Sequence, residues 1–291
     1  MSKRLPVNDA DIIARLRVRL ERRFALRDLP LSLEGASGPL VVALPADPDA
    51  PLDEMAAQQV ARRAAGTNAT PNMTRRVVIG TGADRDERDT GGGSRAAEVA
   101  RATVASGAHL PYWALPWPSG MALAEALLGE PEFACGKRTL ELGCGLGVTA
   151  AVALQLGARL TVSDLFDDAL LFAEYNTRRS AGHAPTTLLL NWRTPEGRER
   201  LLSAAPFGLL LAADVLYEPE DIEPLLALAP ALLQPGAPFW LAEPGRKASR
   251  AFMEATVARG WRDRSSIIER AWPPDGDVTR VTIHRFSLPE P

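Results

Sequence analysis

Two kinds of segment alternate along the chain from about residue 94 to residue 242. Short apolar runs, typical of buried strands, are separated by longer segments in which apolar residues recur every three or four positions, as in helices. The expected strands are 138–142, 159–163, 187–190, 208–212 and 239–242. The expected helices are 94–106, 121–128, 148–156, 167–179 and 222–233. Strands separated by helices in this way predict a parallel sheet with helices on both faces.

The C-terminal end of the chain departs from this alternation. Residues 265–271 and 278–286 flank Pro273-Pro-Asp-Gly-Asp277, which indicates an antiparallel hairpin. The expected fold class is therefore α/β: a seven-stranded, mostly parallel, doubly wound sheet that ends in an antiparallel hairpin.

An N-terminal α/β extension is expected to precede this sheet. Asn8 can cap a helix whose apolar positions, Ile12, Leu16, Leu20 and Phe24, recur every four residues. A strand at 40–44, a helix at 53–65 and a small, polar and glycine-rich linker at 66–93 follow. We expect an extension at 1–105 and a second domain at 106–291.

Composition and charge narrow the classes of partner. The 291 residues carry 33 Lys and Arg against 36 Asp and Glu, so no overall positive field attracts nucleic acid. There are two cysteines, and the N-terminus lacks the apolar core of a signal peptide. The most apolar stretch, 224–242, is interrupted by prolines. We expect a cytoplasmic protein with no membrane or nucleic-acid partner.

Chemistry-bearing residues follow the predicted strands, where doubly wound sheets bind their ligands. The segment Glu141-Leu-Gly143-Cys-Gly145-Leu-Gly147 leads from a strand into a helix whose N-terminus offers free N–H groups. Asp164 ends the next strand and can accept hydrogen bonds from a ribose diol, although alone it could be an ordinary helix cap. Together they predict a nucleoside-containing cofactor.

Two cofactors compete for this loop. Gly145-Leu-Gly147-Val-Thr-Ala150 satisfies a dinucleotide fingerprint, which is weak alone. The acidic Glu141 would repel a pyrophosphate, but it suits the sulfonium and ammonium charges of S-adenosylmethionine. S-adenosylmethionine is therefore the expected cofactor.

The chain resembles the class I S-adenosylmethionine-dependent methyltransferases, and within them the family that methylates protein lysines. Four segments carry the resemblance, which covers about residues 105–291: Pro111-Tyr-Trp-Ala-Leu-Pro-Trp-Pro-Ser-Gly120, the glycine loop, Asn191-Trp192 and Asp214-Val-Leu-Tyr217. A fifth, Glu243-Pro-Gly-Arg246, is similar to the Asp-Pro-Gly-Arg stretch of the branch that methylates the electron-transfer flavoprotein β-subunit. The resemblance implies a Rossmann-like fold.

The resemblance also implies roles for individual residues. The implied cofactor-binding residues are Trp117, Glu141, Gly143, Cys144, Gly145, Gly147, Asp164, Leu165, Asn191, Trp192 and Asp214. Asp214 would orient the acceptor amine and Tyr217 would line its channel, so these two are the expected catalytic residues. Tyr112, Trp113 and Tyr217 would form an aromatic sleeve around the acceptor's stem.

Several alternatives stay open at this point. Trp192, Tyr112 and Trp113 could be core aromatics, and Trp117 could be a structural plug of its turn. The acceptor is expected to be a protein lysine, with a small-molecule amine or hydroxyl as the alternative; a non-catalytic protein that keeps the cofactor fold is a third. The three histidines lack partners at metal-ligand spacing, so no metal is expected.

Overall fold

The computed structural model describes residues 9–51, 111–272 and 276–289. The chain divides into two compact units, one made of residues 1–46 and 113–291 and the other of residues 47–112. The elements expected at 53–65, 66–93 and 94–106 lie outside the described residues. The same is true of the boundary expected at residue 105, which stays a prediction.

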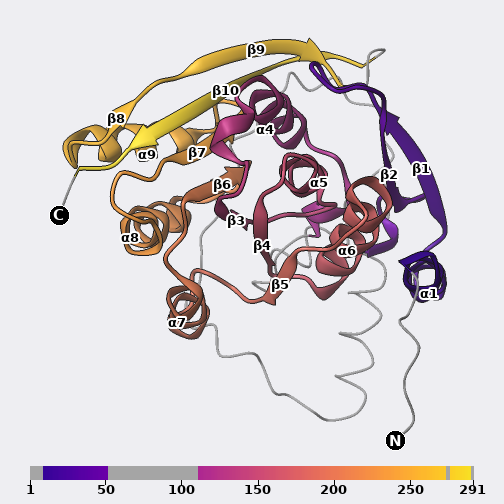
Figure 1. The fold of residues 1–291 in the computed structure, drawn as a ribbon. Helices are drawn as coiled ribbons and strands as arrows, with labels where there is room; N and C mark the ends of the chain where they lie inside the picture. Colours follow the sequence, from indigo (N-terminus) through magenta and orange to yellow (C-terminus); the bar gives the residue numbers. More distant parts are fainter. Residues whose placement is uncertain (1–8, 52–110, 273–275, 290–291) are drawn as a thin grey trace, which may run out of the picture. The chain divides into compact units, whose positions relative to one another are not determined.

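A mixed sheet forms the centre of the first unit (Figure 1). Five parallel strands lie in the order β5-β4-β3-β6-β7. They are β3 (Arg138–Leu142), β4 (Arg159–Asp164), β5 (Thr186–Leu189), β6 (Leu209–Ala213) and β7 (Phe239–Glu243). Their positions confirm the predicted strands to within one residue at each end.

The predicted C-terminal hairpin closes one side of the sheet. Strand β10 (Val278–Ser287) pairs antiparallel with β7, and both β8 (Arg262–Asp263) and β9 (Ser266–Ala271) pair with β10. Asp263 lies opposite Phe286 and Ser266 lies opposite Ile283, so β8 and β9 follow β10 in one register. Counted as one interrupted strand, they give the seven strands expected.

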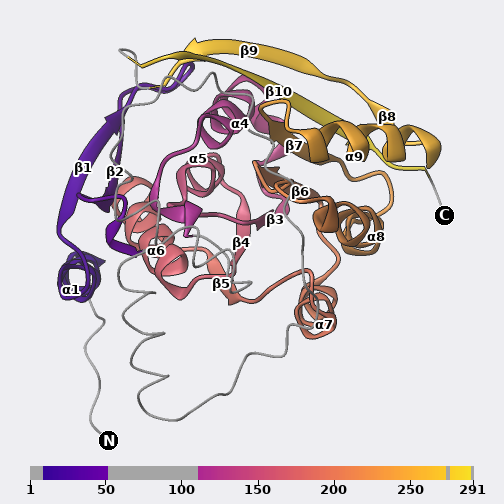
Figure 2. The same ribbon diagram turned by 180° about the vertical axis from the view of Figure 1, so that it is seen from behind.

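Helices cover both faces of the sheet (Figures 1 and 2). One face carries α4 (Pro118–Gly129), α5 (Val148–Gln155) and α6 (Asp167–Ala181). The other carries α7 (Pro195–Ala204), α8 (Ile222–Leu232) and α9 (Lys247–Ala258). The sequence did not predict α7 or α9. Helix α7 buries only Gly197 and Leu201, so its apolar stripe is too thin to give a periodic signal.

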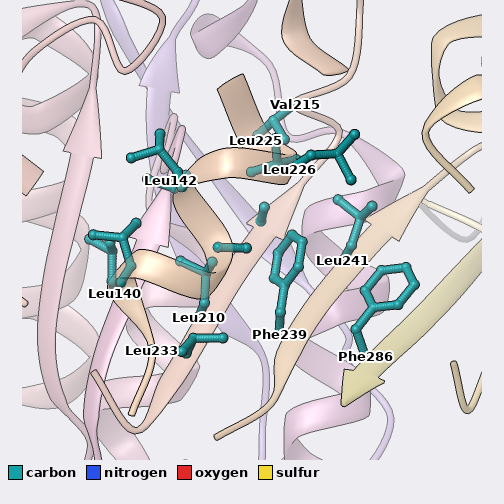
Figure 3. Packing of buried hydrophobic residues seen from close by; sticks show 14 of the residues in the cluster. Leu140, Leu142, Leu210, Val215, Leu225, Leu226, Leu233, Phe239, Leu241 and Phe286 are labelled. Atoms are coloured by element: carbon teal, nitrogen blue, oxygen red, sulfur yellow. The ribbon is translucent and has the colours of Figure 1, made fainter. Parts of the chain in front are cut away.

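An apolar cluster lies between the sheet and α8 and α9 (Figure 3). Leu140, Leu210, Phe239 and Phe286 come from four adjacent strands and meet Leu225 and Leu226 of α8. Strand β7 is buried along its whole length, as expected of a strand covered on both faces. This packing fixes the strand ends from which the functional loops depart.

The N-terminal segment packs on the same unit. Helix α1 (Asp9–Glu21) and the hairpin of β1 (Leu26–Leu31) and β2 (Leu40–Pro45) pack beside α6, where the Phe24 and Phe172 rings lie 5.8 Å apart. The predicted helix and second strand are confirmed. Strand β1 was missed because it contains Arg27, Asp28 and Pro30; proline is tolerated there because β1 pairs on one side only.

Candidate active site

The glycine loop connects β3 to α5 in a conformation that needs its glycines. Gly145 and Gly147 have φ values of 49° and 79°, a region that L-residues rarely adopt. A side chain at Gly147 would also place its Cβ 2.8 Å from the Cα of Ala173 in α6. The loop therefore lies directly against α6, and its shape is set by the fold before any ligand binds.

Asp164 ties the glycine loop to the end of β4. Its Oδ2 accepts a hydrogen bond from the Gly145 N–H at 3.0 Å, and its Oδ1 accepts one from the Phe166 N–H at 3.0 Å. Burial raises the pKa of Asp164 to about 6, against the effect of these bonds. Leu165, the next residue, is 37% exposed, which leaves an apolar surface beside the carboxylate.

Glu141 lies beneath the same loop and is 2% exposed. Burial, together with the negative charge of Asp164, raises the pKa of Glu141 to about 8, and a hydrogen bond with Thr149 opposes this. Its Oε2 has no hydrogen-bond partner among the described residues. A buried carboxyl of this kind fits a cationic ligand group, such as the ammonium of S-adenosylmethionine, and disfavours a pyrophosphate.

Asn191 and Trp192 follow β5 in a tight turn. The Asn191 Oδ1 accepts a hydrogen bond from the Arg193 N–H at 3.0 Å, so its amide Nδ2 is the group that can donate to an adenine edge. Trp192 is partly buried against the apolar cluster, with the Arg193 guanidinium 5.9 Å from its ring centroid. The packing role considered for Trp192 is thus present, and its exposed part can still contact a base.

Asp214 follows β6 and is held by an arginine. The Arg246 Nε and Nη2 atoms lie 2.6 Å and 3.0 Å from Oδ1 and Oδ2 of Asp214, a bidentate pair. Asp214 is 3% exposed and has a φ of 54°, which aspartate tolerates better than most residues. The Arg246 guanidinium also lies 5.5 Å from the ring centroid of Tyr217.

Tyr217 stands at the rim of this group, with 38% of its surface exposed. Loss of water around its hydroxyl, with the negative charges of Asp214 and Asp164, raises the pKa of Tyr217 above its usual value. Its hydroxyl therefore stays protonated over the physiological range and can donate a hydrogen bond. It does not act as a base there.

Asp221 joins the turn after β5 to the turn after β6. Its Oδ2 accepts hydrogen bonds from the N–H groups of Tyr217 and Glu218 at 2.9 Å and 2.8 Å. Its Oδ1 lies 2.5 Å from Nη2 of Arg193. Because Asp221 is fully buried, this bridge fixes the positions of both turns relative to each other.

The comparisons with known proteins agree with this arrangement. Residues 114–257 match a family model described as "Lysine methyltransferase". Over these residues, just under half of the chain, the sequence is similar to the lysine methyltransferase family. This match supports the resemblance found in the sequence and, with it, the S-adenosylmethionine cofactor.

Two curated relatives illustrate the range of this family. The electron transfer flavoprotein beta subunit lysine methyltransferase of Xenopus laevis is 30% identical over 142 residues, covering 47% of this chain and 53% of the relative. The histone-arginine methyltransferase METTL23 of Mus musculus is 28% identical over 156 residues, covering 53% of this chain and 61% of the relative. The chain thus spans little more than half the length of these relatives.

Among solved structures, the N-methyltransferase NodS from Bradyrhizobium japonicum, in complex with S-adenosyl-L-homocysteine, is 18% identical with a TM-score of 0.45. The alignment covers 60% of this chain and 89% of that one.

The aromatic turn of the methyltransferase domain divides between the two compact units. Trp113 is buried, with its ring 5.9 Å from Phe24 and 5.4 Å from Phe172, so it packs in the core. Trp117 is partly buried at the N-terminus of α4. Tyr112 belongs to the unit of residues 47–112. Contacts of these three with cofactor or acceptor stay predictions.

Cys144 lies buried within the glycine loop, and burial raises the pKa of its thiol. A role of this residue at the cofactor would therefore be one of packing. No cluster of three or more metal-ligating side chains occurs in the described residues. Within that same part of the chain, no helix is both long and apolar enough to cross a bilayer.

Sequence reasoning missed Asn176, which braces the glycine loop from α6. Its Nδ2 donates to the carbonyls of Ala43 in β2 and Leu146 in the loop, both at 2.9 Å, and its Oδ1 accepts from the Ala43 N–H at 2.8 Å. Asn176 is 1% exposed. Its position on the apolar face of α6, four residues after Phe172, was the signal that could have revealed it.

Contacts that the sequence did not predict support the segment that carries Arg246. Glu243 ends β7, and its Oε2 accepts from the Gly245 N–H at 2.6 Å. Its Oε1 lies 3.5 Å from Nε2 of His284, whose Nδ1 lies 2.6 Å from Asp263. Burial opposes the charge on His284, but the two carboxylates raise its pKa to about 9. The glutamate at 243 thus reaches a cationic partner in β10.

Proposed function

We propose that this protein transfers a methyl group from S-adenosylmethionine to a lysine side chain of another protein. The observation that carries the proposal is the pair of Asp214 and Tyr217 at the end of β6, within the part of the chain that matches the lysine methyltransferase family. The neighbouring strand ends supply a loop and carboxyl groups suited to the cofactor.

The cofactor would be held by residues at three strand ends. The glycine loop after β3 would receive its methionine part, with Glu141 beneath the ammonium. Asp164 would accept hydrogen bonds from the ribose hydroxyls, and Asn191 would donate to the adenine. When bound, the cofactor supplies an electrophilic methyl group on a positively charged sulfur.

The residues after β6 would bind the acceptor. Tyr217 is exposed enough to line the acceptor's path, and Asp214, fixed by Arg246, would lie at the end of that path. Transfer requires the acceptor nitrogen to point at the methyl carbon, so alignment and removal of water account for most of the acceleration. A free lysine has a pKa of about 10.4, so roughly one side chain in 2,500 is neutral at pH 7.

The test uses purified protein and S-adenosylmethionine labelled with tritium in the methyl group. It is incubated with cell lysate and, separately, with electron transfer flavoprotein β-subunit and with core histones, the substrates that the names of the two relatives specify. We expect label in protein, on lysine by mass spectrometry. Label only in the low-mass fraction would favour a small-molecule acceptor and reject the proposal.

An Asp214→Asn variant distinguishes catalysis by this protein from a contaminating activity. It keeps the size of the side chain and removes its charge. Labelling must fall with this variant and persist with Arg259→Gln, which breaks an exposed ion pair with Glu223 on α8.

A further inference from the structure

Four of the buried carboxyl groups at this edge of the sheet fall into two pairs with different partners; a fifth, Glu243 at the end of β7, contacts His284. Asp214 and Asp221 each contact an arginine, Arg246 and Arg193 respectively. In the described part of the chain, Glu141 and Asp164 have no cationic partner and bond only to hydroxyl or N–H groups. In the half of the edge that holds Asp214 and Asp221, arginines neutralise the carboxylates. In the half that holds Glu141 and Asp164, the described residues supply no positive charge.

The half without positive charge is where a cationic cofactor would be held. The neutralised half is where the acceptor nitrogen would arrive, facing the sulfonium of that cofactor. A cationic acceptor would meet like charge there, and the Asp214 carboxylate would not offset the repulsion, because Arg246 already binds both of its oxygens.

We propose that Arg246 makes the site specific for an uncharged amine, by cancelling the charge of Asp214 so that lysine enters deprotonated and a guanidinium is excluded. The inference rests on the proposed function, since it concerns the acceptor of the same site. It bears on a real division in the family, because the curated relatives include both lysine and arginine methyltransferases.

Lysine and arginine side chains differ in acidity, and this difference lets a site without net charge select between them. At pH 7 roughly one lysine side chain in 2,500 is neutral, whereas at most about one arginine side chain in 300,000 is neutral. In the transfer, the nitrogen lone pair forms the new N–C bond while the C–S bond breaks and its electron pair stays on sulfur. The methylated ammonium then loses its proton to solvent. A guanidinium has no such lone pair available until it is deprotonated.

Other groups near Tyr217 must be considered in any test that varies pH. The charged groups that act on its hydroxyl are Asp164, Asp214, Asp221 and Arg246. The pKa of Asp164 is about 6, and that of His284, which contacts Glu243 behind Arg246, is about 9. Measurements between pH 7 and pH 8 therefore avoid the titration of both. Glu141, with a pKa of about 8, titrates in this range in wild type and variant alike, so the rate of each variant is compared with that of wild type at the same pH.

A pair of cofactor analogues tests the proposal without an acceptor. Sinefungin carries a primary amine, cationic at pH 7, where the transferred methyl group would be; S-adenosyl-L-homocysteine has no group there. The ratio of their dissociation constants, measured by calorimetry, thus reports the charge balance at the acceptor position. In Arg246→Gln, Asp214 is uncompensated, and we expect the ratio to shift at least tenfold towards sinefungin.

Two further variants make the result specific. Arg246→Lys keeps the positive charge and loses the bidentate geometry, so it should stay near the wild-type ratio. Arg259→Gln, at the other end of α9, should leave the ratio unchanged. A ratio in Arg246→Gln within twofold of wild type, or the same shift in Arg246→Lys, would overturn the proposal. The proposal would also be overturned if a folded Arg246→Gln protein no longer bound S-adenosyl-L-homocysteine, since Arg246 would then belong to the cofactor site.

The rate of transfer supplies a second readout with the protein acceptor labelled above. Without Arg246, the bare Asp214 carboxylate retains the lysine proton, so the rate should fall more at pH 7 than at pH 8. A purely structural role would lower both rates by the same factor and would contradict the proposal. If wild-type protein binds neither analogue, the proposed function itself is wrong, which is a separate outcome.

Discussion

Replacing Glu141 with glutamine tests the electrostatics of the cofactor loop through protein stability. The folded-state pKa of Glu141 is about 8, against an ordinary value of 4.5. Between these values the folded state holds a proton that the unfolded state has released, so the stability of the ligand-free protein falls as pH rises. One such group changes the free energy of unfolding by about 1.4 kcal/mol per pH unit. Between pH 6.0 and pH 7.5 the loss is therefore about 2 kcal/mol.

The assay is urea unfolding of wild type and Glu141→Gln at these two pH values. Asp164 and His284 also have raised pKa values, so they too lower the stability as pH rises. The contribution of Glu141 is therefore the difference between the losses of unfolding free energy in wild type and in the variant. We expect the variant to lose about 2 kcal/mol less than wild type over this interval. Equal losses in both proteins would refute the reasoning.

Cofactor binding adds a second measurement of the same group. A bound ammonium beside Glu141 favours its carboxylate, so binding should release the proton that about nine in ten molecules hold at pH 7. Calorimetry of S-adenosyl-L-homocysteine in buffers of different ionisation enthalpy counts that proton. Proton release that persists unchanged in Glu141→Gln would show that another group is responsible.

Three further substitutions test other parts of the site. Asp214→Asn should lower methyl transfer at least 100-fold while the dissociation constant of S-adenosyl-L-homocysteine changes less than about threefold; equal loss of both would assign Asp214 to cofactor binding. Asn176→Leu leaves three buried backbone groups without partners and should cost about 3 kcal/mol of stability by urea unfolding, and a loss below about 1 kcal/mol would contradict the bracing role. The protonated imidazole of His284, with a pKa of about 9, stabilises the fold, and this contribution is lost as pH rises through 9. His284→Gln should therefore lower the free energy of unfolding by about 3 kcal/mol more at pH 6 than at pH 9.5. A loss of stability that does not change with pH would rule out the ion pairs as its cause.

The sequence predicted those parts of the fold that produce strong local patterns. Parallel strands such as Phe239–Glu243 are continuous apolar runs because they are covered on both faces, so they stand out. Strand β1 and helix α7 did not, since an edge strand tolerates Pro30 and a thinly packed helix needs few apolar residues. Pairing and tertiary packing decide these elements, and neither leaves a local signal.

The predicted site shows the same division. The glycine loop, Asp164 and the segment Asp214 to Tyr217 could be found because each follows a strand directly. The partners that fix their charge and position could not be predicted, because they are distant in the sequence. Arg246 binds Asp214 from 32 residues away, and Asn176 binds Ala43 from 133 residues away. Such contacts depend on how the strands are ordered in the sheet. Glu243 likewise contacts His284, which lies on a different strand, β10.

The contact between β2 and α6 has a practical consequence for work on this protein. A shortened version that starts after residue 46 would look harmless from the family match, which begins at residue 114. It would nevertheless uncover Phe172 and strip Asn176 of its hydrogen bonds with Ala43. Weak ligand affinity or aggregation of such a truncated protein would therefore reflect the missing N-terminal hairpin rather than an inactive enzyme.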